Sequence, residues 1–263
     1  MPIERIVHES DASDFYRTAV WKDTPAGTPL ERLPPFTRAQ YARAPFLTRL
    51  YRTHGLFTKV AYHEGDPFLI GRHLDDIAGE SYGDPGDRPL VAFSSLHEGI
   101  EKSLWCYSKN VLPLIADGDR DITAMLAERY EIDALLTDSA ELATLLPALA
   151  SRFPLNRIRH VSVIGISFNV PFIVRMFPGT ALTLVLDLPE TGSIAVSCPT
   201  ALEADRAVFH AAPHRLIERG HDLTITDGRL LPTPLVRYRT GIGVRFLENT
   251  CACDADESFE FAE

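Results

Sequence analysis

The sequence predicts an α/β fold with a parallel, doubly wound core and a smaller β-rich lobe. Through the middle of the chain, short apolar runs alternate with helix-like segments, an order that is typical of parallel sheets covered by helices. After Thr191 the pattern changes to short strands separated by turns. We therefore expect an α/β core domain at 1–190, a β-rich lobe at 191–253 and an acidic tail at 254–263.

We expect the first 50 residues to form a helical, proline-containing segment of the core domain. Thr37 follows two prolines and can cap a helix, because its hydroxyl can accept a backbone N–H of the first turn. Pro89–Ser94 is short and apolar and follows a Gly/Asp/Pro turn, which favours a buried strand. A helix over Glu98–Val111 is expected next.

The clearest periodicity lies between residues 121 and 186. Asp121 can cap a helix whose apolar residues recur at helical spacing: Ile122, Met125, Leu126 and Tyr130. After a strand at Asp133–Thr137, an i, i+3, i+4, i+7 stripe predicts the buried face of the next helix: Leu142, Leu145, Leu146 and Leu149. His160–Ile166 and Ala181–Leu186 read as two more buried strands. In the β-rich lobe, the last strands are expected at Leu235–Tyr238 and Val244–Leu247.

Composition limits the classes of partner. The 36 acidic residues outnumber the 26 basic ones, and the net charge of −10 argues against a nucleic-acid backbone as the main partner. Much of this acidity lies in the segment from Glu248 onward, which predicts a solvated end. No apolar run approaches the roughly 18–20 residues that span a bilayer, and the N-terminus lacks an apolar signal core. We expect a cytoplasmic protein without a membrane partner, whose four cysteines are thiols or metal ligands.

Several motifs follow one another along the chain. They are Leu33–Arg38 (LPPFTR), the helix–strand–helix rhythm over Ile122–Leu149, Asp187–Gly192 (DLPETG) and Pro234–Ile242 (PLVRYRTGI). In content and order they resemble adenylate-forming enzymes, closest to the phenylacetate–CoA ligase and coenzyme F390 synthetase branch. The resemblance implies the N-terminal domain fold of that superfamily. It also implies the formation of an acyl-adenylate from a carboxylate.

The same resemblance implies the site residues. Glu190 falls where the family holds Mg²⁺ and is expected to be catalytic, together with Arg239, which would face a phosphate or the acyl group. Gly165, in the counterpart of the adenine loop, and Asp187, in the segment of the magnesium-binding glutamate, join them as nucleotide-binding positions.

The sequence departs from the family where ATP is held. Ile242 replaces the aspartate that binds the ribose hydroxyls, and its side chain cannot form a hydrogen bond. The counterpart of the phosphate loop, Val60–Pro67, has Asp66 in place of lysine, and an acidic side chain there would repel a triphosphate. The family's C-terminal domain, with its lysine for adenylation, has no counterpart. We therefore expect ATP and Mg²⁺ binding to be weak or lost, and complete CoA ligation not to be performed by this chain alone.

A zinc site is also implied by the F390 synthetase-like branch. Its ligands would be Cys198, His210, Cys251 and Cys253, with His214 as an alternative fourth ligand. Three thiolates and one imidazole form a tetrahedral Zn²⁺ set of the structural type. Without a metal, the pair Cys251 and Cys253 would be two ordinary thiols near the C-terminal end of the sequence.

Three functional hypotheses follow. The first is a degenerate ligase-like protein that binds or activates a small carboxylate or acyl group in a biosynthetic pathway; if it is an enzyme, it is of the acid–thiol ligase type. The second is a non-catalytic, zinc-stapled scaffold or binding subunit for a partner enzyme, which would supply the missing functions. The third is an ATP-independent, acyl-handling enzyme that uses the ancestral acyl pocket.

Overall fold

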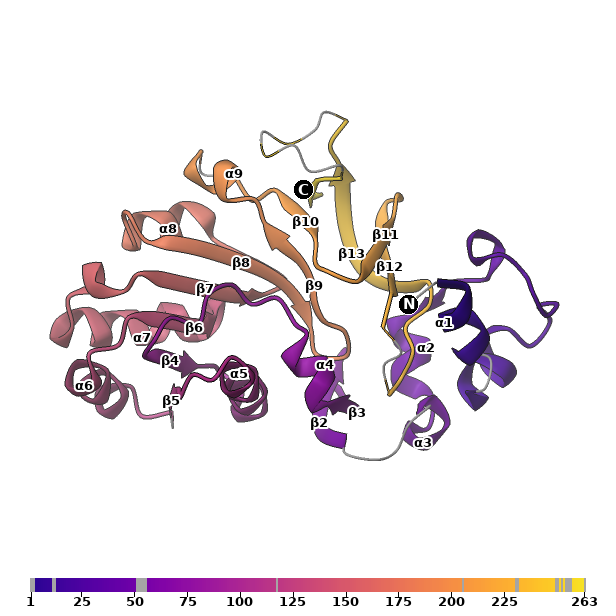
Figure 1. Cartoon of the computed structure of the whole chain (residues 1–263), viewed down its shortest axis with the longest axis horizontal. Helices are drawn as coiled ribbons and strands as arrows, with labels where there is room; N and C mark the ends of the chain where they lie inside the picture. Colours follow the sequence, from indigo (N-terminus) through magenta and orange to yellow (C-terminus); the bar gives the residue numbers. More distant parts are fainter. Residues whose placement is uncertain are drawn as a thin grey trace.

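A twelve-stranded mixed sheet organises the computed structural model (Figure 1). The structure describes residues 3–10, 13–50, 56–116, 118–204, 206–229, 232–248, 251, 253 and 257–262. In the order in which they lie side by side, the strands are β11 (Arg215–Glu218), β12 (Asp222–Asp227), β13 (Tyr238–Phe246), β14 (Phe259–Phe261), β10 (Phe209–Ala211), β9 (Gly192–Ser197), β8 (Ala181–Leu188), β7 (His160–Gly165), β6 (Ala134–Asp138), β4 (Pro89–Ala92) and β5 (Leu114–Ile115). A further short strand, β1 (Phe36–Thr37), pairs in parallel with the start of β13.

The strands from β5 to β8 are parallel, which confirms the predicted α/β core. Alternate strand residues point to opposite faces, and both faces are apolar because helices cover both. On one face, Val91, Leu136 and Ile164 pack with Trp105 of α5 (Leu96–Ser108), beside α4 (Leu74–Ala78). The core of the opposite face includes residues from α6 (Arg120–Tyr130), α7 (Ser139–Arg152) and α8 (Val170–Met176).

Of the two predicted apolar helix faces, one is confirmed and one is wrong. The four leucines of α7 are all buried. In α6, however, Ile122, Met125 and Tyr130 are exposed and Leu126 is only half-buried, and the helix buries its small residues instead: Thr123, Ala124 and Ala127. Small side chains let α6 pack closely on α7. The helix is capped by Asp119 rather than Asp121, since the Asp119 carboxylate accepts the backbone N–H groups of residues 121 and 122.

The pairing changes from parallel to antiparallel between β8 and β9, next to the boundary expected at residue 190. Hydrogen bonding is nevertheless continuous across it, so the β-rich part extends the core sheet. The two strands predicted at 235–238 and 244–247 are replaced by the single strand β13, which begins at Tyr238.

The prediction of a solvated acidic tail is wrong for the described residues 257–262. There, β14 pairs with both β10 and β13, and Phe259 is buried. The aromatic rings in this short strand outweigh its acidic neighbours: Phe259 packs on Phe209 and Phe246, while Phe261 packs on Phe168. Residues 254–256 of the predicted tail lie outside the described residues.

The region expected to match a phosphate loop forms a β-hairpin. Strands β2 (Leu56–His63) and β3 (Asp66–His73) pair along their whole length. The two turn residues, Glu64 and Gly65, have φ values of 53° and 89°, the backbone shape of a tight two-residue hairpin turn. Glu64 and Asp66 are exposed at this tip, which makes it a solvated acidic turn.

Short helical elements precede and connect these strands. They are α1 (Ile3–Ser10), the π-helical turn η1 (Tyr16–Val20), η2 (Leu30–Arg32), α2 (Arg38–Arg43), α3 (Phe46–Arg49), η3 (Leu155–Arg157) and α9 (Pro199–Glu203). Thr37 caps α2 as predicted, in a reciprocal capping box with Gln40.

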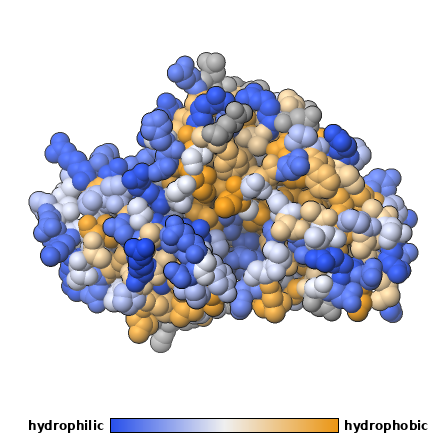
Figure 2. Space-filling model, turned by 180° about the vertical axis from the view of Figure 1, so that it is seen from behind, coloured by the Kyte–Doolittle hydropathy of each residue, from blue (hydrophilic) through white to orange (hydrophobic). Residues whose placement is uncertain are grey.

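Among the described residues, no helix is both long enough and apolar enough to cross a membrane. Seen from behind, the molecule is hollowed near its centre, and apolar side chains gather there (Figure 2).

Candidate functional site

Motifs that are far apart in the sequence meet at the end of β8. The two residues of β1 lie beside Tyr238 and Arg239 of β13. Arg38, which directly follows β1, forms an ion pair with Glu190 in the turn between β8 and β9, although 152 residues separate them in the sequence. Three of the four motifs that carry the family resemblance therefore converge on one carboxylate.

Glu190 is held entirely by side chains of the chain itself. The Arg38 guanidinium contacts both carboxylate oxygens, with Nε 2.8 Å from Oε1 and an Nη2 donor 3.2 Å from Oε2. The Tyr238 hydroxyl donates a hydrogen bond to Oε1. The Glu190 side chain has no exposed surface. Burial and the adjacent Glu190 carboxylate raise the pKa of Tyr238 well above its usual value, so the hydroxyl remains a donor. We call these three residues the Glu190 centre.

Arg239 is not part of the Glu190 centre. Successive residues of a strand point to opposite faces, and Tyr238 is buried while Arg239 is exposed. Arg239 instead pairs with Asp222 of β12. The signature's other arginine, Arg237, lies outside the strand with a φ of 52°, pairs with Glu218 and donates to the backbone carbonyl of Leu33. The two arginines do not share one face of a strand, because β13 begins only after Arg237.

The two remaining predicted nucleotide positions have different surroundings. Gly165 ends β7, and a Cβ placed there would meet no atom within 4 Å, so this strand end is open. Asp187 is buried, with the Tyr82 hydroxyl 3.1 Å and the Lys102 ammonium 3.3 Å from its carboxylate. Burial raises the pKa of Asp187 to about 6, against the opposing effect of Lys102. Ile242 is half-buried and packs against the main core.

Asp187 belongs to a buried ionic network that sequence reasoning missed. Lys59 of β2 lies 2.5 Å from Glu101 of α5, and Lys102 contacts Glu101 and Asp187. A second part of the network surrounds Glu80, whose carboxylate contacts the guanidinium groups of Arg72, Arg215 and Arg229. The network joins the β2–β3 hairpin to the rest of the molecule. Charged residues on strands and helices are usually exposed to solvent, so nothing local in the sequence indicated this buried network.

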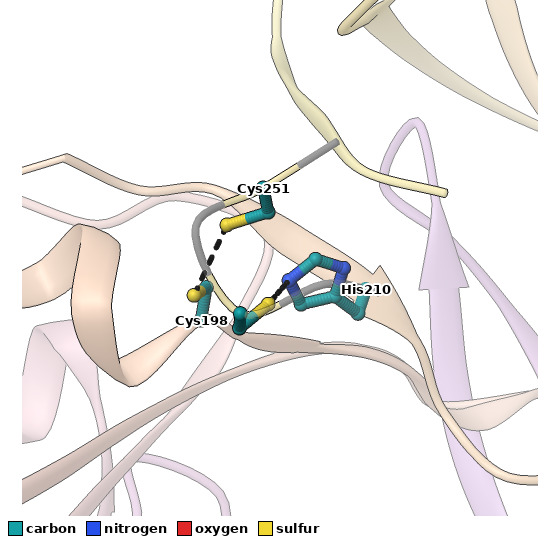
Figure 3. Close-up of side chains that lie close together, drawn as sticks. Cys198, His210 and Cys251 are labelled. Carbon is teal, nitrogen blue, oxygen red and sulfur yellow. Dashed lines mark hydrogen bonds between the residues drawn. The ribbon is translucent and has the colours of Figure 1, made fainter. Parts of the chain in front are cut away.

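The four predicted metal ligands converge at the end of β9 (Figure 3). Cys198 follows β9, His210 lies on the neighbouring strand β10, and Cys251 and Cys253 lie between β13 and β14. Their donor atoms all lie within 4.8 Å of one another. The Cys198 and Cys251 sulfurs are 3.2 Å apart, and the Cys253 sulfur is 3.1 Å from His210 Nε2. Thiolates bound to one Zn²⁺ at about 2.3 Å lie roughly 3.8 Å apart in a tetrahedron. These four residues, the Cys/His cluster, could close around such an ion with small shifts.

The ring orientation of His210 suits metal binding. Its Nδ1 lies 2.8 Å from the backbone carbonyl of Glu257. A carbonyl only accepts, so Nδ1 carries the proton and Nε2 presents its lone pair toward the cysteines.

The alternative ligand, His214, is not one of the four converging residues. It lies in a turn with a φ of 67°. Cys106 is buried in the apolar core beside Trp105, and burial raises the pKa of its thiol to about 12.

The sheet order and the connections around Glu190 place the chain in one fold class, the N-terminal domain fold of adenylate-forming enzymes. Its sequence matches no family model, and no curated protein matches it either. Among solved structures, 2-hydroxyisobutyryl-CoA ligase in complex with 2-HIB-AMP and CoA is similar at a TM-score of 0.71 and 13% identity, over 97% of this chain and 71% of that one.

Two further solved structures carry the same fold. The same ligase in its postadenylation state with 2-HIB-AMP gives a TM-score of 0.74 at 12% identity, covering 97% of this chain and 64% of that chain. Amide bond synthetase McbA from Marinactinospora thermotolerans gives 0.62 at 18% identity, over 81% and 50% of the two chains. This chain therefore spans roughly two thirds of the CoA ligase chains that it matches, and the shared property is the fold.

Proposed function

We propose that this chain binds a small carboxylic acid at the Glu190 centre and that its reaction, where it has one, is an acyl-adenylate step. The observation that carries the proposal is the contact of the Arg38 guanidinium with both oxygens of the Glu190 carboxylate. A planar guanidinium that contacts both oxygens of a carboxylate is a ready receptor for another carboxylate. The two structures of 2-hydroxyisobutyryl-CoA ligase were solved with 2-HIB-AMP, and they support an acyl group as the ligand of this fold.

The proposal gives each residue of the centre a role. An incoming acid exchanges with Glu190 on Arg38, and Tyr238 continues to donate its hydrogen bond to Glu190. The exchange frees Glu190 for the role that the family resemblance implies, which is to bind Mg²⁺. Until then the ion pair with Arg38 occupies Glu190. Complete CoA ligation by this chain alone is not part of the proposal. The acidic hairpin tip at Asp66 and the apolar Ile242 lack the groups that would grip ATP.

The finer family assignment also belongs to the proposal. The PLVRYRTGI run followed by Cys251 and Cys253 favours the phenylacetate–CoA ligase and F390 synthetase branch. With that branch we propose that the Cys/His cluster holds Zn²⁺ in a structural role. A closed set of three sulfurs and one nitrogen leaves no open position for a substrate.

Calorimetric titration with a panel of aryl and short-chain acids tests the exchange. Because Glu190 competes with the acid for Arg38, we expect Glu190→Gln to tighten acid binding by about tenfold, and Arg38→Lys to weaken it by a similar factor. Glu128→Gln, an exposed carboxylate on α6, is the matched control. If Glu190→Gln weakens binding instead, the carboxylate contacts the ligand directly and the exchange is wrong. Pyrophosphate release with ATP and Mg²⁺ then decides whether bound acid is activated.

The second candidate function is a zinc-stapled binding subunit that catalyses no reaction of its own. The Cys/His cluster favours this candidate. Ion pairing of Glu190 with Arg38 and of Arg239 with Asp222 supports it, because both predicted catalytic residues are engaged within the chain. Acid binding without pyrophosphate release, together with stoichiometric zinc and a co-purifying partner enzyme, would favour this candidate. Pyrophosphate release that depends on an added acid would exclude it.

A further inference from the structure

We propose that the cavity between α1 and the loop after Trp21 binds an organic cation with an apolar or aromatic body. The cavity has a volume of about 650 Å³, within the range of pockets that hold small molecules. It is lined by residues of α1, of the loop at 24–29 and of η2. None of these residues belongs to the Glu190 centre or the Cys/His cluster. The inference does not rest on the proposed function.

The walls are largely apolar and include one aromatic ring. Val7, Pro25, Pro29 and Leu30 line the cavity together with Trp21. The indole of Trp21 is only 6% exposed and packs on Tyr16, with 4.3 Å between ring centroids. Its Nε1–H has no acceptor among the described residues. A rigid indole is the strongest aromatic partner for a cation, and it can also stack on an aromatic ligand.

The charged groups of the lining are acidic. Glu4 and Glu31 bring two carboxylates, and His8 lies one helical turn after Glu4. The lining contains no lysine or arginine, and neither carboxylate has an ion-pair partner within the described part of the chain. A carboxylate or phosphate ligand would be repelled here, whereas an ammonium group would be attracted by both glutamates and by the indole.

A metal ion is a poorer match for the same residues. Metal sites gather their donor atoms around one point, and within the described chain the one grouping of that kind is the Cys/His cluster. Glu4, His8 and Glu31 do not form such a group. Carboxylates that are spread over an apolar cavity fit a ligand with a charged end and a bulky body. A hydrophobic amine has this chemistry.

Three probes of similar shape and different charge test the inference by calorimetric titration: 2-phenylethylamine, 2-phenylethanol and 3-phenylpropionate. We expect the amine to bind at least about tenfold more tightly than the alcohol. The acid should not bind in this cavity. Glu4→Gln and Glu31→Gln should each weaken amine binding by about three- to tenfold while leaving alcohol binding unchanged. Glu128→Gln, an exposed carboxylate on α6, which lies at the opposite end of the molecule from α1 (Figure 1), should leave amine binding unchanged.

Each alternative outcome overturns the inference. Equal binding of amine and alcohol, unaffected by either glutamine variant, would mean an uncharged apolar pocket. Failure of all three probes up to their solubility would mean that the cavity does not take this ligand class. Binding of 3-phenylpropionate that Arg38→Lys does not weaken would place an anion here, against the charge of the lining. Both glutamates lie on the surface, so these variants should fold, and circular dichroism checks it.

Discussion

The Glu190 centre and the Cys/His cluster are two polar sites along one sheet, and their polar groups are compensated in opposite ways. In the Glu190 centre the chain supplies the counter-charge through Arg38, and the neutral Tyr238 hydroxyl adds a hydrogen bond to the carboxylate. In the Cys/His cluster, three sulfurs and one imidazole nitrogen converge on one another. None of these four groups is a permanent cation of the kind that Arg38 provides for Glu190, so a bound metal ion would supply the positive charge. Two of the four, Cys251 and Cys253, are contributed by the segment between β13 and β14.

This difference decides how each site should respond to loss of a partner. Removing a cation from a buried ion pair leaves an uncompensated charge, whose cost is set by burial. Removing a ligand from a structural metal set lowers metal affinity, and with it the folding free energy that metal binding supplies. Loss of a partner is therefore measured by stability in the first site, and by metal content and stability together in the second.

The largest effect is expected from the Cys/His cluster. Cys251→Ser should reduce bound zinc from about one equivalent to a small fraction of one, because the tetrahedral set loses a thiolate. The loss should cost about 5 kcal/mol or more of folding free energy, or roughly 10–20 °C in Tm. Metal analysis of protein purified without chelators, with thermal unfolding in parallel, measures both quantities.

Two matched variants sharpen this test. His210→Asn should lose zinc, whereas His214→Asn should keep it, since His214 lies outside the cluster and asparagine tolerates its φ of 67°. Cys106→Ala should also keep zinc, because that thiol is buried in the apolar core. Less than half an equivalent of metal in the unaltered protein would refute the zinc proposal.

The next largest effect is expected at the Glu190 centre. Arg38→Met leaves the Glu190 carboxylate buried without its cation and should destabilise the protein by about 3–5 kcal/mol. The double variant Arg38→Met with Glu190→Gln should recover most of this loss, because the amide can be buried at a lower cost. Urea unfolding of the single and double variants gives the coupling energy.

Arg43→Met on the same short helix is the control for this cycle, since Arg43 is exposed and should change stability by less than about 0.5 kcal/mol. A loss below about 1 kcal/mol for Arg38→Met would show that the ion pair with Glu190 is weak. The contrast between the two sites would then fail on the side of the Glu190 centre.

Much of the parallel core could be predicted, since β4, β6, β7 and β8 each coincide with a short apolar run and α7 carries a leucine stripe, whereas the two-residue strand β5 was not predicted. Helix α6 misled prediction because its large apolar residues face outward, and only its packing on α7 reveals that the small residues are buried. Strand β14 was missed because its three residues lie in an acidic context. Its pairing depends on two strands elsewhere in the chain.

The candidate sites show the same division. The ligands of the Cys/His cluster came from the family resemblance, and the structure brings the same four residues together. Arg38 lay in a recognised motif, yet nothing local indicated a partner 152 residues away. The buried network of Lys59, Glu101 and Lys102 was beyond prediction for the same reason. Whether a charged side chain is solvated or paired is decided by tertiary contacts.

A smaller effect is expected from acid, and it falls on the ionic network. Burial alone would raise the pKa of Glu80, but the guanidinium groups of Arg72, Arg215 and Arg229 lower it to about 2, from an ordinary value of 4.5. A lowered folded-state pKa contributes stability above pH 4.5 that is lost as the pH falls toward 2. The contribution amounts to about 3 kcal/mol. Urea unfolding across this pH window measures it.

Asp187, in the same network, should change folding stability with pH in the opposite direction. Its folded-state pKa is raised by burial to about 6, from 3.8. It therefore contributes stability below about pH 3.8 that is lost as the pH rises through 6. Glu80→Gln should flatten the acid limb of the stability profile, and Asp187→Asn should flatten the limb between pH 4 and 6. An unchanged profile in both variants would show that these carboxylates do not control the pH response.

The smallest effect is expected from Arg239, the exposed counterpart of Arg38. Its ion pair with Asp222 joins two half-exposed side chains, 44% and 37% exposed, so water screens the attraction. Arg239→Gln should change the free energy of unfolding by less than about 1 kcal/mol, and Asp222→Asn should do the same. Urea unfolding measures stability, and titration with the acids that bind the unaltered protein measures ligand affinity. Since Arg239 points away from the face on which Tyr238 meets Glu190, we expect acid affinity to be retained. A tenfold loss of acid or nucleotide affinity at unchanged stability would instead return Arg239 to the phosphate- or acyl-facing role that the family resemblance implies, and would show that this half of the signature does more than hold β12 to β13.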